Sequence, residues 1–162
     1  MENRSNPLRV RLAKDRDIPR LLELLRQVNN VHQRLRPDLF LEDQTKYTEK
    51  DLEQLLRLHD AAVFVAADGQ DRVRGYLICY IKQIRGSNLV SRKNMHIDDL
   101  CVDETERHSG VGRLLLEAAK AYAKEIGCTD ITLNVWEGNA DAMEFYANRG
   151  FAPKSHILEM KL

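Results

Sequence analysis

The 162-residue sequence has few cysteines and prolines, no long hydrophobic run and no excess of either charge. Its three cysteines, Cys79, Cys101 and Cys128, are odd in number and far apart, which argues against a disulfide framework. They form no C-x-x-C pair and have no cluster of histidines beside them, so we expect no bound metal. Cys79 and Cys101 fall in segments typical of strands, where a cysteine is usually a small buried hydrophobic residue.

The charges balance, because 25 Lys and Arg residues face 25 Asp and Glu residues. Without an overall positive field, the chain is a poor candidate for a dedicated binder of nucleic acid or of an anionic membrane surface. The longest apolar run, residues 61–67, is too short to span a bilayer. The first seventeen residues are rich in charge and open no apolar stretch, so we expect no secretory signal and a cytoplasmic location.

The composition is sufficient for one folded domain, with 43% hydrophobic and 31% charged residues and no internal repeat or linker. We therefore expect a single domain over residues 1–162. Apolar spacing predicts strands at residues 8–13, 61–67, 72–84, 95–102, 128–136 and 157–162. It predicts helices from residue 18 to before Pro37, around residues 48–56, over residues 111–126 and from Asn139 to Arg149. The expected order is β α α β β β α β α β.

A glycine-containing segment separates a predicted strand from the most regular predicted helix. It reads Arg107-His108-Ser109-Gly110-Val111-Gly112-Arg113, so its glycines lie at the N-terminus of that helix. Free N–H groups and the positive end of the helix dipole favour an anion there, whereas the two arginines alone add unfavourable like charge. A bound phosphate reverses that balance, because cations and N–H donors then converge on it. We interpret the segment as a pyrophosphate site; the alternative is a plain helix start beside solvated arginines.

The spacing does not fit two common nucleotide motifs. A P-loop requires Lys followed by Ser or Thr after its second glycine, and no such pair follows Gly112. The dinucleotide fingerprint has a third glycine where this chain has Leu115, and it belongs to the first strand–helix turn of its domain. The remaining pattern is R-x-x-G-x-G after a strand.

Leu100-Cys101-Val102 with the segment from Arg107 to Gly112 resembles the acetyl-CoA motif of the GNAT superfamily of N-acetyltransferases. That motif is a strand, then [RQ]-x-x-G-x-[GA], then a helix. Downstream, Asn139 to Tyr146 and Gly150-Phe151 resemble the closing N-x-x-A-x-x-F-Y and G-F segment of the same family. The resemblance is close over about residues 95–152. It implies an α/β fold, with one acetyltransferase domain whose mixed, bent central sheet is flanked by helices and whose fourth and fifth strands splay to admit the pantetheine arm.

The resemblance also implies a reaction and a set of site residues. The expected reaction is direct transfer of acetyl from acetyl-CoA to a primary amine of a small molecule, as in the diamine acetyltransferases. Backbone groups near Cys101 would hold the acetyl group, and the Tyr146 hydroxyl would hydrogen-bond to the leaving thiolate. The expected acetyl-CoA-binding residues are Leu100, Cys101, Val102, Arg107, His108, Ser109, Gly110, Val111, Gly112, Arg113, Asn139 and Tyr146.

Asp98 and Asp99 are the candidate groups for the amine, because aspartate is uncommon in strands and two in succession need a reason. An alkylammonium has a pKa near ~10.4, so its neutral, nucleophilic form lies about 4.6 kcal/mol uphill at pH 7. A carboxylate can attract the cation and accept its proton, directly or through water. Side chains alternate along a strand, so we expect the two carboxylates to face opposite sides of the sheet and one of them to face the acceptor. The alternative is a strand end that reaches solvent or a structural hydrogen bond to a loop.

The sequence is also compatible with other functions. The chain could be a non-catalytic module that binds or senses acyl-CoA, although the presence of Tyr146 argues for chemistry. It could instead be a protein N-terminal acetyltransferase, or a nucleotide-binding domain. The resemblance allows a homodimer, but the sequence does not identify the acceptor amine.

Overall fold

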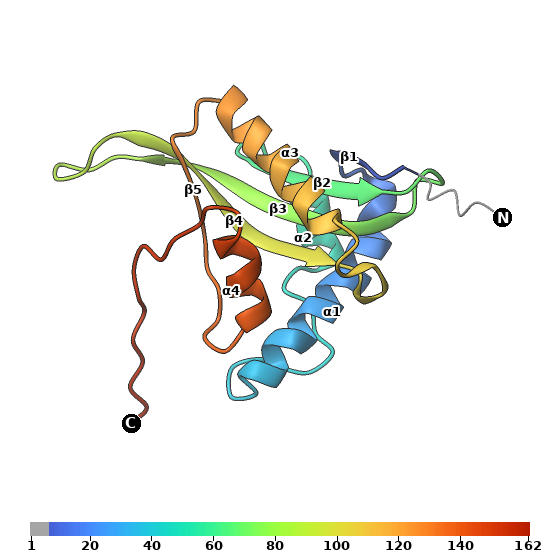
Figure 1. The fold of residues 1–162 in the computed structure, drawn as a ribbon, viewed down its shortest axis with the longest axis horizontal. Helices are drawn as coiled ribbons and strands as arrows, with labels where there is room; N and C mark the ends of the chain where they lie inside the picture. The colour runs from blue at the N-terminus through green and yellow to red at the C-terminus, as the bar shows by residue number, and fades with distance from the viewer. Residues whose placement is uncertain (1–6) are drawn as a thin grey trace.

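Five strands form the central sheet of the computed structural model, which describes residues 7–162 (Figure 1). The strands are β1 (Arg9–Leu12), β2 (Ala61–Ala67), β3 (Val73–Ile84), β4 (Arg92–Val102) and β5 (Asp130–Leu133), and they lie in that order across the sheet. The first four pair in antiparallel fashion, whereas β4 and β5 are parallel. This mixed sheet confirms the expected fold class.

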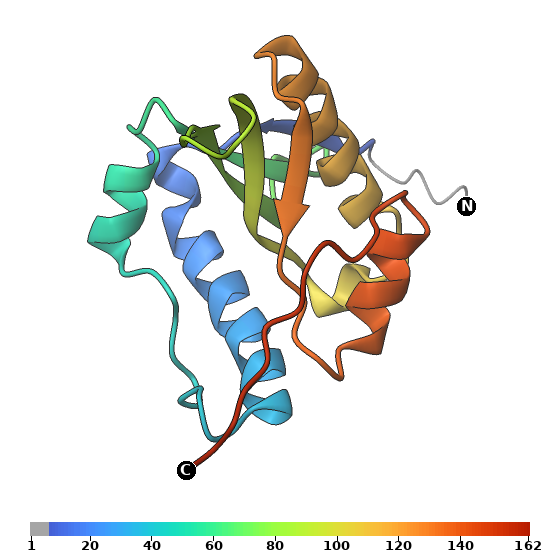
Figure 2. The same ribbon diagram turned by 90° about the vertical axis from the view of Figure 1, so that its left-hand side faces the viewer.

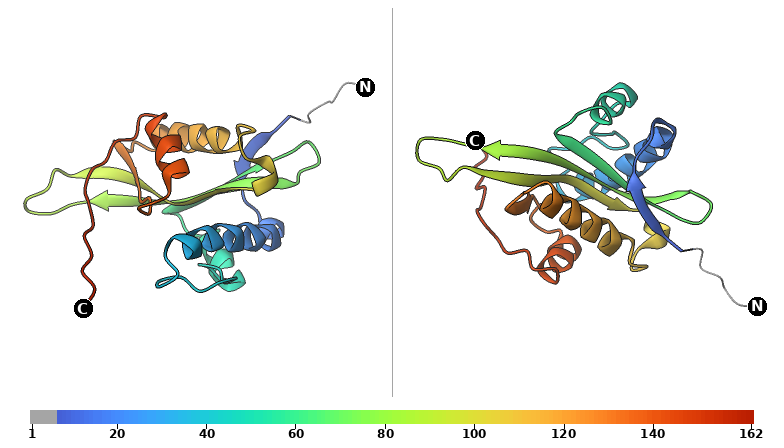
Figure 3. Two further views of the ribbon diagram at one scale, coloured as in Figure 1. Left: turned by 60° about the horizontal axis from the view of Figure 1, so that its bottom comes forward. Right: turned by 90° about the horizontal axis from the view of Figure 1, so that it is seen from above.

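Within residues 7–162, four helices cover the two faces of the sheet. The helices α1 (Ile18–Leu35) and α2 (Glu49–Leu55) lie on one face, while α3 (Val111–Glu125) and α4 (Ala140–Ala147) lie on the other (Figures 2 and 3). Short 3-10 turns, η1 (Asp15–Asp17) and η2 (Glu104–Glu106), precede α1 and α3. No helix of this described part of the chain is both long and apolar enough to cross a membrane.

Two hydrophobic layers fix the helices to the sheet. One layer joins α1 and α2 to the first face and contains the fully buried Leu21 and Tyr76. The other joins α3 to the opposite face and contains the fully buried Leu77 and Leu115. Tyr76 and Leu77 are neighbours on β3 and enter different layers because side chains alternate along a strand.

β4 has a bulge at the point where its pairing with β5 stops. Asp99 pairs with Ile78 and Ile97 pairs with Cys79, so Asp98 is an extra residue without a partner on β3. β5 pairs with β4 only up to the position of Ile97, while β4 runs on for five more residues. The two parallel strands therefore part at Asp98, as the resemblance implied.

The C-terminal segment differs from the sequence-based expectation. Residues 151–162 form no strand, so the strand predicted at residues 157–162 is wrong for the single chain. The segment is extended and runs beyond the end of β5 toward the C-terminal end of α1 (Figure 2). A strand needs a neighbour for its backbone hydrogen bonds, and no strand of residues 7–162 pairs with this segment. The predicted strand at 128–136 shortens to β5, and the last helix ends at Ala147 rather than Arg149.

Candidate functional site

The segment between β4 and α3 has an unusual backbone. His108 and Gly110 both have positive φ angles, of 64° and 89°, and Gly110 is the N-cap of α3. Turns of this kind direct neighbouring N–H groups to one side and form concavities that bind anions. A Cβ atom on Gly110 would meet nothing within 4 Å, so a glycine is favoured here by the backbone angle and not by crowding.

This segment is also exposed and positively charged. The side that faces solvent carries Arg107, His108, Ser109, Gly110 and Arg113. No carboxylate among residues 7–162 forms an ion pair with Arg107 or Arg113. The carboxylate of the nearby Glu106 pairs with the Arg74 guanidinium instead, at an N–O distance of 3.4 Å. The N–H groups of the first helical turn have no partner within the helix. Cations and N–H donors can therefore bind one anion together.

A polar hollow of about 280 Å³ lies next to this segment. Arg107 lines one side of it, and Arg26 and Arg34 of α1 line the other together with neighbouring polar residues. Three arginines around one hollow outnumber its two glutamates, Glu23 and Glu104. The surface beside the positive end of α3 thus adds to the local preference for an anion.

Val111 and Gly112 are buried and have a packing role. A Cβ atom on Gly112 would lie 3.2 Å from ring atoms of Phe145 on α4 and 3.5 Å from the Val102 side chain. Gly112 therefore allows α3 to approach α4 closely, a reason for this glycine that the motif did not indicate. Of the two glycines, Gly110 is the one whose surroundings leave room for a ligand.

The backbone from Leu100 to Val102 borders the gap between β4 and β5. The Asp103 N–H donates to the Arg74 carbonyl at 2.8 Å, and alternation from that bond directs the Leu100 N–H and C=O away from β3. The Val102 carbonyl accepts a hydrogen bond from the Gln27 side chain at 2.9 Å. Leu100 is therefore the position at which backbone groups face the gap between the parallel strands.

The cysteines have no catalytic environment. All three are free thiols, and the Cys101 thiol donates to the Leu24 carbonyl at 3.4 Å. Burial raises the pKa of the Cys79 thiol to about 12 and that of Cys101 still further. The reactive thiolate is thus strongly disfavoured. Within the part of the chain that the structure describes, no group of three or more His, Cys, Asp or Glu residues is placed to hold a metal.

Asp98 lies in a cluster with three residues from other parts of the chain, which we call the Asp98 cluster: Lys46, Tyr47, Tyr80 and Asp98. The Lys46 Nζ atom is 2.8 Å from both carboxylate oxygens, and the Tyr47 hydroxyl donates to one of them at 2.6 Å. The Tyr47 and Tyr80 hydroxyls are 2.8 Å apart. Burial and the Asp98 charge raise the pKa of Tyr47, so this phenol remains a hydrogen-bond donor.

Asp99 points to the same face of the sheet as Asp98. Its carboxylate accepts a hydrogen bond from the Tyr76 hydroxyl at 2.8 Å, and Tyr76 is buried in the layer beneath α1. Tyr80 in the Asp98 cluster is four residues from Tyr76 on β3 and shares its face. The expectation that the two carboxylates face opposite sides is therefore wrong, because the extra residue in the bulge interrupts the alternation.

Burial is the main reason why Asp99 differs from an ordinary aspartate. It raises the pKa of Asp99 to about 6, and the Asp98 carboxylate adds to the rise, while the Tyr76 hydroxyl and Lys46 oppose it. A carboxyl with this pKa changes its protonation state close to neutral pH. Asp99 can therefore accept and release a proton under ordinary conditions.

Tyr146 and Asn139 lie on α4 as expected. The Asn139 side chain accepts a hydrogen bond from the Ala142 N–H at 3.2 Å, which confirms its N-cap role. The half-buried Tyr146 ring packs edge-on between Phe145 and Phe151, at centroid distances of 5.1 and 5.4 Å. Burial raises the pKa of Tyr146, and the negative charge of Asp99 adds to the rise, so the two groups are near enough to affect each other.

Comparison with known proteins decides the family. The Acetyltransferase (GNAT) family matches residues 18–151, from the start of α1 to the residue after Gly150. The chain belongs to the GNAT family. It is accordingly an acetyl-CoA-dependent acyltransferase, and the matched residues include the segment at the start of α3.

Individual relatives and a solved structure agree with this assignment. The GNAT chain is 26% identical over 144 residues to an uncharacterized N-acetyltransferase in the pepI 3′ region of Lactobacillus delbrueckii subsp. lactis, covering 85% of this chain and 80% of that protein. It is 33% identical over 103 residues to the peptidyl-lysine N-acetyltransferase YjaB of Escherichia coli strain K12, covering 62% of this chain and 58% of YjaB. A solved mutant of the BH1408 protein from Bacillus halodurans has a TM-score of 0.91 at 28% identity, covering 95% of this chain and 99% of that one.

The sequence pattern located the glycine segment and α4 of this GNAT domain but missed the surroundings of the aspartates. Lys46 and Tyr47 come from the connection between α1 and α2, a loop that was expected to affect the choice of acceptor but whose shape the sequence does not indicate. One signal was available, because Tyr76 and Tyr80 are spaced to share one face of a predicted strand. A polar hydroxyl pair on a buried strand face indicates polar partners nearby.

Proposed function

We propose that this GNAT chain transfers acetyl from acetyl-CoA directly to a primary amine of a small molecule, and that Asp98 receives the cationic acceptor. One observation carries the proposal. The ammonium group of Lys46, itself a primary alkylamine, lies on the Asp98 carboxylate with both N–O distances at 2.8 Å. The Asp98 cluster therefore has the charge, the size and the hydrogen-bond acceptors to hold an alkylammonium group.

The residues at the start of α3 suit the acetyl-CoA that the family uses. Acetyl-CoA supplies the acetyl thioester. Arg107, Arg113 and the open N–H groups of α3 would bind the pyrophosphate, and the free space at Gly110 admits its close approach. The Leu100 backbone, which faces the gap, would donate to the acetyl oxygen as it gains negative charge. A donor fixed in advance at such a position typically lowers the barrier by ~3 kcal/mol.

Two side chains would handle the protons. Asp99, with a pKa of about 6, would accept the proton of the bound ammonium directly or through a water molecule, which leaves the amine neutral and nucleophilic. Tyr146 has a raised pKa and is a weaker acid than a thiol of pKa ~8.5. It would therefore donate a hydrogen bond to the sulfur as charge develops there, without giving up its proton.

A panel of amines tests the proposal. Acetyl-CoA is incubated with diamines, polyamines, monoamines, a blocked lysine and a lysine-free peptide with a free N-terminus, and the released CoA thiol is measured. We expect the small primary amines to be at least tenfold better substrates by kcat/KM than either peptide-like acceptor. No turnover of any amine, despite acetyl-CoA binding by calorimetry, would instead support a non-catalytic acyl-CoA-binding module.

A lysine side chain of a protein is a second candidate acceptor. It is favoured by the group that lies on Asp98, which is a lysine ammonium, and by the relative YjaB, which is named a peptidyl-lysine N-acetyltransferase. The same panel separates the two candidates. A blocked lysine that outperforms every small amine would assign the acceptor to proteins.

A further inference from the structure

Lys46 places a primary amine of the chain itself in the site proposed for the acceptor. Its Nζ atom is 2.8 Å from each carboxylate oxygen of Asp98. Among the lysines of residues 7–162, Lys46 is the one whose ammonium group contacts this carboxylate. The neighbouring Tyr47 donates its hydroxyl hydrogen bond to the same group. The chain therefore holds an alkylammonium group of its own where a substrate ammonium is expected to bind.

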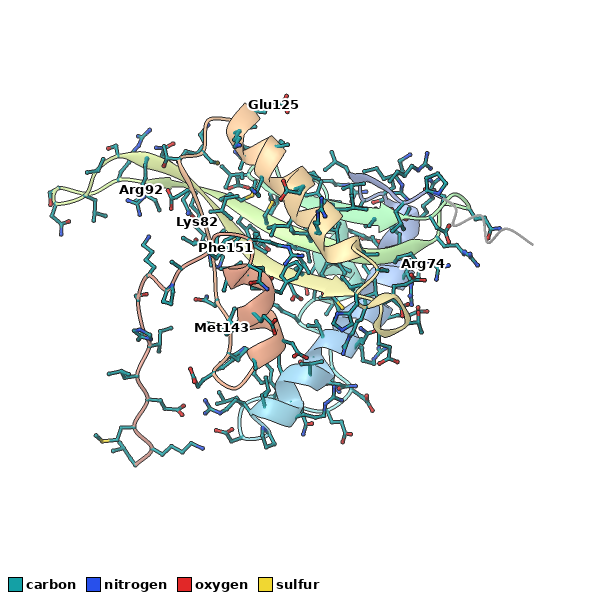
Figure 4. The ribbon with its side chains drawn as sticks, in the orientation of Figure 1. Arg74, Lys82, Arg92, Glu125, Met143 and Phe151 are labelled. Carbon is teal, nitrogen blue, oxygen red and sulfur yellow. The ribbon has the colours of Figure 1, made fainter. Side chains whose placement is uncertain are left out.

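The amine and the thioester would reach the gap between β4 and β5 from opposite faces of the sheet. Lys46 belongs to the connection between α1 and α2, which lie together on one face (Figure 3). Tyr146 belongs to α4 on the other face, and Met143 marks this helix in Figure 4. The pairing of β4 with β5 stops at Ile97, so the sheet is open beside Asp98. A nitrogen atom on Asp98 is thus next to the opening that the thioester would enter.

The Lys46 side chain can leave Asp98 at little cost. It is 53% exposed, and an ion pair with so exposed a partner is screened by solvent. Its flexible four-carbon chain allows the nitrogen atom to move while the backbone stays in place. The positive charge of Lys46 also lowers the pKa of Asp99, so the lysine lies close to the carboxylate that we assign to proton transfer.

We propose that the chain acetylates its own Lys46, at Nζ, in the acceptor site. The neutral Nζ atom attacks the thioester carbon of acetyl-CoA, so a C–N bond forms while the C–S bond breaks and leaves its electron pair on sulfur. The ammonium loses one proton before the attack, and the nitrogen loses a second after it. One proton ends on the CoA thiol, and the other is released to solvent through Asp99. The inference rests on the proposed function, because it uses the same site and the same acetyl donor.

The modification changes the charge that the acceptor meets. Acetylated Lys46 is a neutral amide and can no longer form an ion pair with Asp98. The Asp98 carboxylate then has no ammonium group of the chain to compete with an incoming amine. The nitrogen atom and the carboxylate belong to one chain, so the reaction is intramolecular with respect to the protein. Its rate constant should not depend on the protein concentration.

Incubation of the chain with acetyl-CoA, in the absence of any added amine, tests the proposal. The mass of the intact chain is followed with time, and the modified residue is located by peptide mass spectrometry. We expect one acetyl group on Lys46, formed at least tenfold faster than on Lys82. Lys82 is a suitable comparison because it is an exposed lysine on β3, two residues from Tyr80 of the Asp98 cluster (Figure 4). The rate constant should be the same over a wide range of protein concentration.

Three variants and a competitor separate the enzymatic reaction from uncatalysed acetylation. Lys46→Arg keeps a positive charge and should lose the fast reaction, whereas the matched control Lys82→Arg should retain it. Tyr146→Phe should slow the acetylation of Lys46 at least tenfold, because an uncatalysed reaction would not need this hydroxyl. An amine that the panel identifies as a substrate should also slow it, since both would use Asp98.

The outcomes distinguish this inference from the proposed function. Turnover of small amines without acetylation of Lys46 would overturn the inference alone. The same would follow if Lys82 reacted as fast as Lys46, or if the rate constant rose in proportion to the protein concentration. No transfer to Lys46 or to any amine, despite binding of acetyl-CoA, would overturn the proposed function as well.

Discussion

Lys46 lies where the acceptor amine is expected to bind, so an incoming amine must displace it. Replacing Lys46 with Met removes the ammonium group and keeps an unbranched side chain of similar length. We expect the KM for the acceptor amine to fall while kcat stays close to that of the wild type. The expected change in KM follows from the strength of the ion pair that the acceptor has to break.

The structure limits the size of this effect. The Asp98 side chain is 17% exposed, but that of Lys46 is 53% exposed, so solvent screens the pair. Ion pairs as exposed as this contribute about 0.2–1 kcal/mol, which converts to a decrease in KM of about 1.4- to 5-fold. The positive charge of Lys46 also lowers the pKa of Asp99. Its removal should therefore move the acidic limb of the kcat/KM profile to higher pH.

Steady-state kinetics with an amine identified in the panel measures both effects. Lys124→Met is the matched control, because Lys124 is an exposed lysine on α3, far along the chain from the Asp98 cluster. A higher KM in Lys46→Met would refute the reasoning, since it would mean that Lys46 helps to bind the acceptor. Equal KM values in the two variants would show that the acceptor does not use Asp98.

Three further outcomes are expected. Tyr146→Phe should lower the single-turnover rate ten- to a thousandfold, equivalent to about 1.4–4 kcal/mol, with melting temperature and acetyl-CoA affinity close to wild type. Gly110→Asp should weaken acetyl-CoA binding in calorimetry far more than Gly110→Asn. Asp and Asn accept the positive φ angle at this position about equally well, but only Asp places a negative charge at the proposed anion site. The pKa of Asp99 rises from 3.8 to about 6 on folding, so the wild type should lose stability as pH rises through that interval. Asp99→Asn keeps a hydrogen-bond acceptor for Tyr76 but cannot ionise, so its stability should not fall over this pH interval. Urea titrations should show that the free energy of unfolding of the wild type decreases relative to that of the variant, by an amount that approaches about 3 kcal/mol.

Local signals account for the parts of the fold that the sequence predicted well. The glycine segment, the regular apolar spacing of α3 and the N-cap at Asn139 each depend on a few consecutive residues, and the structure confirms them. The position of the glycine segment at the start of α3 and that of Tyr146 on α4 were predictable for the same reason. Both follow from helix starts and helix spacing.

The remaining parts of the site depend on contacts between distant segments. The bulge at Asp98 arises from the way β3 and β4 pair, and no residue type in β4 marks it. Lys46 reaches Asp98 across 52 positions of sequence, along a connection without regular spacing. The prediction of a terminal strand was wrong for a related reason, because residues 157–162 have the apolar pattern of a strand but pair with no strand in the described part of the chain.

The bulge makes the site sensitive to the length of β4 as well as to its composition. A substitution at Asp98 changes one functional group and leaves the pairing of the strand intact. Deletion of Asp98 would remove the carboxylate and the bulge together, because Asp99 would still oppose Ile78 and Ile97 would still oppose Cys79 in an unbroken ladder. The rest of β4 would keep its faces, but the strand would lose the local bend at the point where β4 and β5 part. A substitution at Asp98 therefore changes only the chemistry of the site, whereas a deletion changes its shape as well and should lower activity further than Asp98→Asn.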